Sequence, residues 1–334
     1  MEILKPRSVS NHQNQDKPYI ILIGLGLIGD SILKRLLGTG SYISLGEIPL
    51  DWNHRDSLRD SMASAMEIVS REAFKESSIS SLVVIWAAGR AGFSAGSEQT
   101  SSEFVAFQSM ANEIVRKKVM ADRINFILFS SAGGLYEGQT NIDEDSRLTI
   151  RRPYGRLKLN QEAYVSNLEE ISRIFIIRPS AVFGGISTTK RMGLIPTMIF
   201  NGLSYQVTDI VGSPHTLRDF VWVEDVARFV ENLVIKIDEL GEKRVNKYIL
   251  ASGKPSSIFE IKTKIESLLQ RSLLISYKGM ENSLHMTYLK PSMLPFWSPT
   301  PEGEAISRVY YDWMASGTLK EKKPGSEEGA KRLS

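Results

Sequence analysis

Tyr154 and Lys158 are the two residues of this sequence whose types and spacing best suit proton transfer. On a helix, a spacing of four brings both side chains to one face. A free phenol loses its proton only near pH 10, so acid or base work at neutral pH requires a stabilised phenolate. A lysine ammonium one turn away supplies a charge of the right sign. The pair therefore predicts a tyrosine that exchanges a proton with a substrate hydroxyl or ketone.

Two hydroxyl groups follow an apolar segment upstream of this pair. Residues 124–129 have the continuous apolar character of a strand buried on both faces, and Ser130 and Ser131 come directly after them. Open α/β sheets place their ligands at the carboxyl ends of parallel strands. We expect one of these serines to hydrogen-bond the reacting group and align it with Tyr154.

A glycine turn near the amino end predicts a binding site for the phosphates of a dinucleotide. The apolar residues 19–23 lead into the sequence GLGLIG, and an amphipathic segment follows. The first glycine permits a tight turn, the second lets the backbone approach a pyrophosphate, and the third lets helix and strand pack closely. The helix N-terminus adds oriented N–H groups. The predicted residues of this site are Gly24, Gly26, Leu27, Ile28 and Gly29.

Glu47 stands about 20 residues beyond the turn, where an acidic residue accepts bonds from the adenosine ribose hydroxyls. Its carboxylate would repel a 2′-phosphate, so NAD is favoured over NADP as cofactor. Arg55 lies nearby in the sequence, and its positive charge weakens the preference for NAD. A solvated loop glutamate is the alternative interpretation of Glu47.

The elements that must position these residues alternate between apolar runs and amphipathic stretches. The pattern predicts an α/β fold with a Rossmann-type, doubly wound parallel sheet and a smaller C-terminal α/β domain interleaved with it. The expected strands are 19–23, 42–45, 82–86, 124–129 and 174–177, and the expected helices are 31–37, 57–74, 102–119 and 154–168. Residues 220–223, a helix over 226–235 and residues 248–250 are expected to return to the first domain.

The predicted boundaries follow from this alternation. Residues 18–182 and 219–252 form the dinucleotide-binding domain, and residues 183–218 and 253–316 form the substrate-binding domain. Residues 1–17 lack a long apolar run and are expected to be a disordered leader. Residues 317–334 are charged and almost without large apolar groups, so a disordered tail is expected there.

Composition excludes several classes of function. The 334 residues contain no cysteine and four scattered histidines, so neither thiolate chemistry nor a metal site is expected. The formal charge of +3 is small and its basic residues are spread along the chain, so the sequence indicates no nucleic-acid-binding surface. No run approaches the roughly 20 apolar residues that span a bilayer. These features predict a cytoplasmic protein without a nucleic-acid or membrane partner.

Taken in order, the motifs resemble the extended short-chain dehydrogenase/reductases, the family of NAD-dependent nucleotide-sugar epimerases and dehydratases. The resemblance extends from residue 19 to about residue 313. The matching segments are the glycine turn, Trp86-Ala87-Ala88-Gly89, Ser130-Ser131 to Tyr136, Tyr154 to Lys158, Arg178-Pro179 to Phe183-Gly184, and residues 218–227.

The resemblance implies roles for further residues. Ala87, Ala88, Gly89, Arg178 and Ser180 would line the cofactor together with Glu47, Tyr154 and Lys158. Ser131, Ala132, Ala181 and Arg218 would contact the substrate, with Arg218 at its pyrophosphate. Ala88 and Gly89 could instead be small only for packing, and Arg218 could pair with Asp219 or Glu224. A homodimer through helices 102–119 and 154–168 is expected from the same resemblance.

Two departures from the family pattern bear on the reaction. Ala132 stands where the family usually has a catalytic serine or threonine, so the hydroxyl must come from Ser131, from Ser130, or from substrate or water. Gly133 and Gly134 stand where dehydratases carry an Asp-Glu pair, which disfavours dehydration.

The leading hypothesis is therefore a nucleotide-sugar epimerase that oxidises a sugar carbon transiently with bound NAD. An NAD(P)-dependent ketoreductase or dehydrogenase acting on a similar substrate would use the same residues. A non-catalytic NAD(P)-binding sensor or scaffold is the third hypothesis, and Ala132 is the residue that favours it.

Overall fold

The structure of the protein is a computed structural model. It describes residues 1–7, 17–75, 79–116, 121–185, 192–237, 239–240, 243–278, 289–292, 294 and 296–316. The tail expected over 317–334 and residues 117–119 of an expected helix lie outside the described residues.

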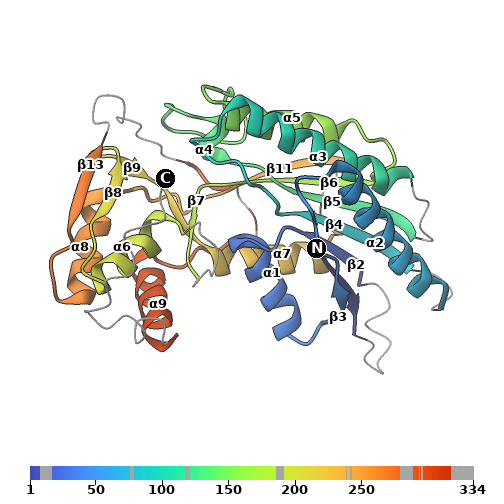
Figure 1. Ribbon diagram of the computed structural model, residues 1–334, viewed down its shortest axis with the longest axis horizontal. Coiled ribbons are helices and arrows are strands. Elements are labelled where there is room, and N and C mark those ends of the chain that lie inside the picture. Colours follow the sequence, from blue (N-terminus) through green and yellow to red (C-terminus); the bar gives the residue numbers. More distant parts are fainter. Residues whose placement is uncertain are drawn as a thin grey trace.

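A seven-stranded sheet forms the centre of the larger part of the molecule (Figure 1). Six of its strands run parallel, and β1 runs antiparallel to both of its neighbours. The order is β11-β6-β5-β4-β2-β1-β3. The strands are β1 (Glu2–Pro6), β2 (Tyr19–Ile23), β3 (Tyr42–Glu47), β4 (Ile79–Trp86), β5 (Ala121–Phe129), β6 (Arg173–Pro179) and β11 (Val245–Leu250).

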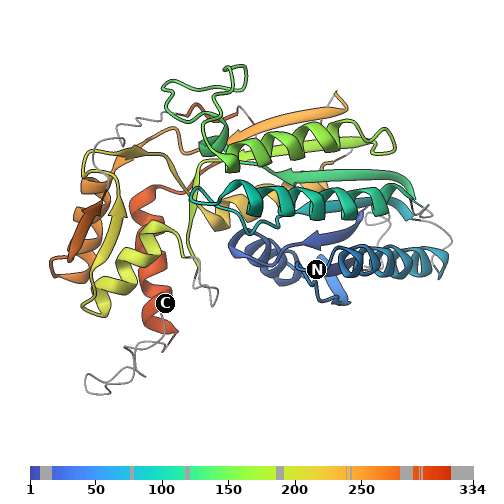
Figure 2. The ribbon, with the colours of Figure 1, turned by 45° about the horizontal axis from the view of Figure 1, so that its top comes forward.

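Helices cover both faces of this sheet, which confirms the doubly wound Rossmann-type fold. The helices α1 (Leu27–Gly38) and α7 (Val223–Ile235) pack on one face, and α2 (Arg55–Lys75), α3 (Ser97–Arg116) and α5 (Pro153–Ser166) pack on the other (Figures 1 and 2). Successive side chains of a buried strand point to opposite faces, so a continuous apolar run supplies both cores. In β2, Ile20 and Leu22 face α1, whereas Ile21 and Ile23 face α2.

The expectation of a disordered leader over residues 1–17 is wrong for its first part. Strand β1 lies between β2 and β3, with Glu2 opposite both Leu22 and Glu47. Ile3 and Leu4 are fully buried, one in each core. Burial of two such side chains stabilises the fold by about 1.5–3 kcal/mol each. Together with ladder hydrogen bonds on both sides, this burial offsets the entropy of ordering a short strand.

A smaller part of the molecule follows β6 in the chain and lies beside the carboxyl ends of the sheet (Figure 1). Its main helices pack around a separate apolar core. The elements are β7 (Ala181–Phe183), α6 (Leu194–Leu203), β8 (Thr208–Val211), β9 (Leu217–Arg218), β10 (Phe220–Trp222), β12 (Ser256–Ser257), α8 (Ile258–Leu269), β13 (Ile275–Lys278) and α9 (Glu302–Ala315). They pair as three small sheets, β10-β7, β12-β9 and β13-β8.

The two parts are interleaved along the chain, as expected. After β10 the chain returns to the large sheet through α7 and β11, which pairs with β6. The expectation for residues 220–223 needs correction, because β10 pairs with β7 and its Phe220 and Trp222 lie in the core of the smaller part.

Candidate active site

Tyr154 and Lys158 lie at the start of α5, over the carboxyl end of β5. Pro153 occupies the first turn of the helix, where its missing N–H costs nothing. The Lys158 Nζ atom lies 5.9 Å from the centre of the Tyr154 ring. This ammonium donates hydrogen bonds to the Phe129 carbonyl and to Gln161 Oε1, each of 3.2 Å. The lysine is 5% exposed, so its charge is held in a fixed place beside the half-buried tyrosine.

The two serines after β5 have different environments. Ser130 Oγ donates a hydrogen bond of 2.5 Å to Glu162 Oε1 in the interior. Ser131 forms the N-cap of the short helix α4 (Ala132–Leu135), where its Oγ accepts a bond of 3.1 Å from the Gly134 N–H. Because Ser131 acts there as an acceptor, its hydroxyl proton can donate to a substrate oxygen. Ser131 is thus better suited than Ser130 to replace the hydroxyl missing at Ala132.

Arg178 is part of a buried network of hydrogen bonds. Its Nε and Nη2 atoms donate to Glu162 at 3.0 and 2.6 Å, and Nη1 donates to the Tyr136 hydroxyl at 2.5 Å. Burial disfavours the guanidinium charge, but the bonds to Glu162 outweigh it and raise the pKa of Arg178. All its nitrogens are engaged, so this geometry gives no support to the prediction that Arg178 contacts the cofactor. The network instead ties β6 to α5 and α4.

The glycine turn fits the pyrophosphate of a dinucleotide. Gly24 has a φ of +93°, and a Cβ there would lie 2.4 Å from the backbone of Ala88. A Cβ on Gly29 would lie 1.9 Å from the Gly24 carbonyl oxygen. By contrast, a Cβ on the exposed Gly26 would meet nothing within 4 Å. The turn therefore packs tightly inside and leaves open backbone at the first turn of α1, where phosphates bind to helix N–H groups.

The residues after β4 divide between packing and site. Ala88 is 6% exposed and packs on Gly24, so it has a packing role there, and its contact with the cofactor stays a prediction. The Cβ of Ala87 lies near Gly29 in the same way. An added Cβ on Gly89, however, would lie 3.9 Å from Lys158 Nζ, so Gly89 borders the catalytic pair.

Strand β1 brings to this edge of the sheet an acidic residue, Glu2, that the sequence did not indicate. Strand β1 separates β3 from β2, so Glu47 is two strand spacings from β2 and Glu2 is one, with a spacing of about 4.8 Å. Glu2 is 6% exposed and accepts a hydrogen bond from Ser44 Oγ. Because β1 is antiparallel, its first residues lie at the carboxyl edge of the sheet. Glu2 was missed because residues 1–17 were interpreted as a leader.

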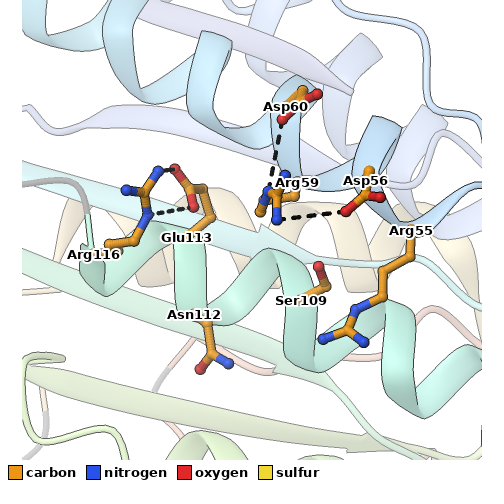
Figure 3. A pocket seen from close by; sticks show the side chains of 8 residues that line it. All are labelled: Arg55, Asp56, Arg59, Asp60, Ser109, Asn112, Glu113 and Arg116. Carbon is orange, nitrogen blue, oxygen red and sulfur yellow. Dashed lines mark hydrogen bonds and ion pairs between the residues drawn. The ribbon is translucent and has the colours of Figure 1, made fainter.

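Arg55 faces a different part of the surface. It lines an open cavity of about 810 Å³ between α2 and α3, and its side chain is directed toward α3 (Figure 3). Its cationic neighbours there are paired: Arg116 Nη2 lies 2.6 Å from Glu113, and Arg59 Nη1 lies 3.4 Å from Asp56. This cavity does not include Tyr154 or Lys158.

Arg218 carries a positive charge without an acidic partner among the described residues. Its Nη2 donates a long bond of 3.4 Å to the Val211 carbonyl, and burial lowers the pKa of Arg218. The alternative that it pairs with Asp219 or Glu224 is not observed. The buried Asp219 accepts bonds from Ser252 and Gly253 instead, while Glu224 accepts one from Ser31. A partly buried, unpaired guanidinium is suited to bind an anion.

The remaining predicted contacts lie where β6 leads into the smaller part. The Ser180 N–H donates to Leu250 and the Ala181 N–H to Asp219, so the backbone here joins both parts. The Ser180 hydroxyl lies beside the Asp219 carboxylate. Ala132 is fully buried in α4.

Phe93 is a further residue of the site that the sequence did not indicate. Its side chain is 47% exposed, and its ring centre lies 5.4 Å from that of Tyr154. A Cβ on Gly133 would lie 3.1 Å from Phe93 Cζ, and a Cβ on Gly134 would lie 3.1 Å from two carbons of the Tyr154 ring. A side chain at either position would require the neighbouring ring to shift by a few tenths of an ångström.

The described residues also bear on other classes of site. Within those ranges, no group of three or more His, Asp or Glu side chains is placed to hold a metal ion. None of the helices described is both long enough and apolar enough to cross a membrane.

A doubly wound sheet, an open glycine turn and a Tyr–Lys pair over the end of β5 define a dinucleotide-dependent enzyme fold. Comparison with known proteins gives the family. Residues 20–246 match the NAD dependent epimerase/dehydratase family, and the chain belongs to that family of enzymes.

Two curated relatives match part of the chain. The "Putative UDP-glucose 4-epimerase" of Methanocaldococcus jannaschii is 30% identical over 202 residues, which cover 57% of this chain and 63% of that protein. The dTDP-4-dehydro-6-deoxyglucose reductase of Escherichia coli is 25% identical over 181 residues, which cover 52% and 54%. The chain thus spans less than two thirds of the length of either relative.

Solved structures share the fold at low sequence identity. MoeE5 in complex with UDP-glucose and NAD has a TM-score of 0.69 at 19% identity, covering 89% of this chain and 99% of that chain. The Thermus thermophilus UDP-glucose 4-epimerase complex with NAD has a TM-score of 0.69 at 14% identity and the same coverage. RMD from Pseudomonas aeruginosa, complexed with NADPH, has a TM-score of 0.67 at 18% identity, again with 89% and 99% covered.

Proposed function

We propose that this protein is an NAD-dependent nucleotide-sugar epimerase. The observation that carries the proposal is the fixed ammonium of Lys158 beside Tyr154 at the carboxyl end of β5, with the Ser131 hydroxyl proton available at the next turn. When bound beside the glycine turn, the nicotinamide cofactor would supply the hydride chemistry of the reaction.

The residues of the chain handle the proton. Tyr154 as phenolate takes the hydroxyl proton while the carbon loses hydride, so the C–OH group becomes a ketone. Lys158 stabilises the phenolate through its charge. Ser131 donates a hydrogen bond to the same substrate oxygen and aligns it. On the return step Tyr154 gives the proton back, and delivery of hydride to the opposite face of the ketone inverts the carbon.

Dehydration is disfavoured by residue type, because Gly133 and Gly134 carry neither an acid nor a base, and their surroundings are close-packed. An acid at position 133 would meet Phe93, and one at position 134 would meet the ring of Tyr154. The elimination of water therefore lacks its acid and base at these positions.

For the cofactor we propose NAD in preference to NADP. Glu2 and Glu47 lie opposite each other on adjacent strands at the carboxyl edge of the sheet, where their charges would repel a 2′-phosphate. Arg55, which could have favoured NADP, is directed into the groove between α2 and α3 (Figure 3).

For the substrate we propose a nucleoside diphosphate sugar. Arg218 would bind the diphosphate because its guanidinium has no acidic partner among the described residues. Residues 183–218 and 253–316 would form the substrate-binding portion. A homodimer through the outer faces of α3 and α5 belongs to the same proposal.

A ketoreductase is the second candidate, because the E. coli relative is named a reductase and the same residues would serve. Incubation with a panel of UDP-, dTDP-, GDP- and CDP-sugars separates the two, with products analysed by mass and chromatography. A product of equal mass without net change in nicotinamide absorbance supports the epimerase. A stoichiometric change in that absorbance supports the reductase, and loss of water contradicts both.

The role of Tyr154 is tested by Tyr154→Phe, with Tyr164→Phe as the matched control. Tyr164 lies on the same helix, and its hydroxyl donates to Asn112 at 2.5 Å. We expect Tyr154→Phe to lose at least about 100-fold in turnover while its Kd for NAD stays within a few-fold. Tyr164→Phe should keep its turnover. If the unaltered protein binds NAD but turns over no sugar of the panel, it is a sensor or scaffold.

A further inference from the structure

Glu103 is a buried acidic residue of α3 that the proposed mechanism does not use. It is 7% exposed, and its Oε2 atom accepts hydrogen bonds of 2.7 Å from the N–H groups of both Arg90 and Ala91. Its other oxygen, Oε1, is buried and has no hydrogen-bond partner within the described part of the chain. A buried carboxylate oxygen without a partner is costly, so its surroundings require an explanation.

The unpartnered oxygen faces the catalytic lysine across Gly89. A Cβ built on Gly89 would lie 3.4 Å from Glu103 Oε1 and 3.9 Å from Lys158 Nζ. The carboxylate and the ammonium therefore border the same small space, which stays open because residue 89 has no side chain. Opposite charges on either side of a single glycine attract each other.

The lysine has hydrogen-bonding capacity to spare on this side. An ammonium has three protons to donate, and the bonds of Lys158 to Phe129 and Gln161 use two of them. An acceptor without a donor and a donor without an acceptor thus lie on either side of Gly89.

Two arginines near Tyr154 and Lys158 pair with other carboxylates, Arg152 with Glu137 at 2.7 Å and Arg178 with Glu162 at 2.6 Å. The guanidinium of Arg90 donates to the neutral Asn53 Oδ1 at 3.1 Å, and Arg90 and Arg156 are both exposed, so solvent screens their charges. Glu103 is thus a buried carboxylate beside Lys158 that no ion pair between described side chains neutralises.

We propose that Glu103 is a positioning residue of the catalytic pair. Its carboxylate holds the loop of residues 89–91 against α3 and acts through Lys158, as its counter-charge, to set the pH at which Tyr154 ionises. The inference rests on the proposed function for the catalytic role of Tyr154, although the coupling exists whether or not a sugar is turned over.

The charge is removed with little change of shape by Glu103→Gln. The glutamine carbonyl oxygen can still accept the two loop N–H bonds, but it bears no charge. Without the carboxylate, the positive charge of Lys158 acts undiminished on the phenolate. We expect the titration midpoint of Tyr154 to fall, because a negative charge that opposes the phenolate has been removed.

The midpoint is read from the near-ultraviolet absorbance of the phenolate. Subtracting the titration of the matching Tyr154→Phe protein isolates Tyr154, and this reading needs no turnover. If activity is found, the limb of its pH profile that reports Tyr154 should move by the same amount. A protein that turns over no sugar would refute the proposed function and still give the Tyr154 midpoint.

Two further variants separate charge from structure. Glu113→Gln changes another buried glutamate of α3, 2% exposed and 2.6 Å from Arg116, and should leave the midpoint unchanged. Glu103→Asp keeps the charge and disturbs the shape more, so its midpoint should stay near that of the unaltered protein. The proposal is overturned if Glu103→Gln leaves the midpoint in place, or if Glu103→Asp shifts it as far as Glu103→Gln does.

Discussion

Replacement of Arg178 by methionine tests whether this arginine supports the fold or contacts the cofactor. The side chains of Arg178 and Glu162 are each 3% exposed, and two hydrogen bonds join them. Arg178→Met would leave the Glu162 carboxylate buried with only the Ser130 hydroxyl as partner. Loss of one member of such a pair costs about 3–5 kcal/mol, a large part of the roughly 5–15 kcal/mol that stabilises most proteins.

The double variant measures the interaction between the two side chains more directly than either single variant does. Arg178→Met combined with Glu162→Leu removes both charges and leaves mainly the hydroxyls of Ser130 and Tyr136 without partners. This should cost only about 2 kcal/mol. If Glu162→Leu alone costs a similar amount to Arg178→Met, the two single losses together should exceed the loss in the double variant by about 4 kcal/mol or more.

Urea-induced unfolding followed by tryptophan fluorescence measures these free energies, and titration with NAD measures the Kd of each variant. Lys278→Met is the control, because Lys278 and Asp209 form a pair of 2.8 Å whose side chains are 63% and 59% exposed. It should change stability by less than about 1 kcal/mol. The reasoning is refuted if Arg178→Met costs no more than this control. If a stable double variant bound NAD tenfold more weakly, that result would support the cofactor contact predicted from the sequence.

Two other predictions concern the cofactor site. Glu2→Gln combined with Glu47→Gln should improve the Kd for NADP relative to that for NAD at least about tenfold, since two charges that repel a 2′-phosphate are lost; an unchanged ratio would contradict the proposed preference. Gly24→Ala should lower the free energy of unfolding by more than about 2 kcal/mol, because its φ is +93° and its Cβ would lie 2.4 Å from Ala88. Gly26→Ala should leave the melting temperature unchanged and weaken NAD binding, and equal stability losses at both glycines would refute this division of roles.

The sheet could be predicted from the sequence wherever a strand is buried on both faces. Residues 19–23 and 174–177 are continuous apolar runs, and both lie inside observed strands. Strand β1 could not be predicted, because only Ile3 and Leu4 are large and apolar between Glu2 and the residues Lys5 and Pro6. Its position in the sheet depends on hydrogen bonds with β2 and β3, and the sequence of residues 2–6 alone does not reveal these partners.

The site was predictable where chemistry follows chain spacing, as for Tyr154 and Lys158. The choice between Ser130 and Ser131 required the position of Glu162, which comes from another element. Glu103 did leave a signal that was missed: it stands on the apolar stripe of its helix, three and seven positions before the buried Ala106 and Met110. A charged residue on such a stripe indicates a buried polar interaction.

The position of β1 has a consequence for the order in which the chain can fold during synthesis. Glu2–Pro6 forms its hydrogen bonds with β2 on one side and β3 on the other, and β3 ends at Glu47. Since β3 ends some forty residues after β1, a chain emerging from the ribosome cannot complete this pairing until all of β3 has followed β1. Until then Ile3 and Leu4 lack the sheet that buries them.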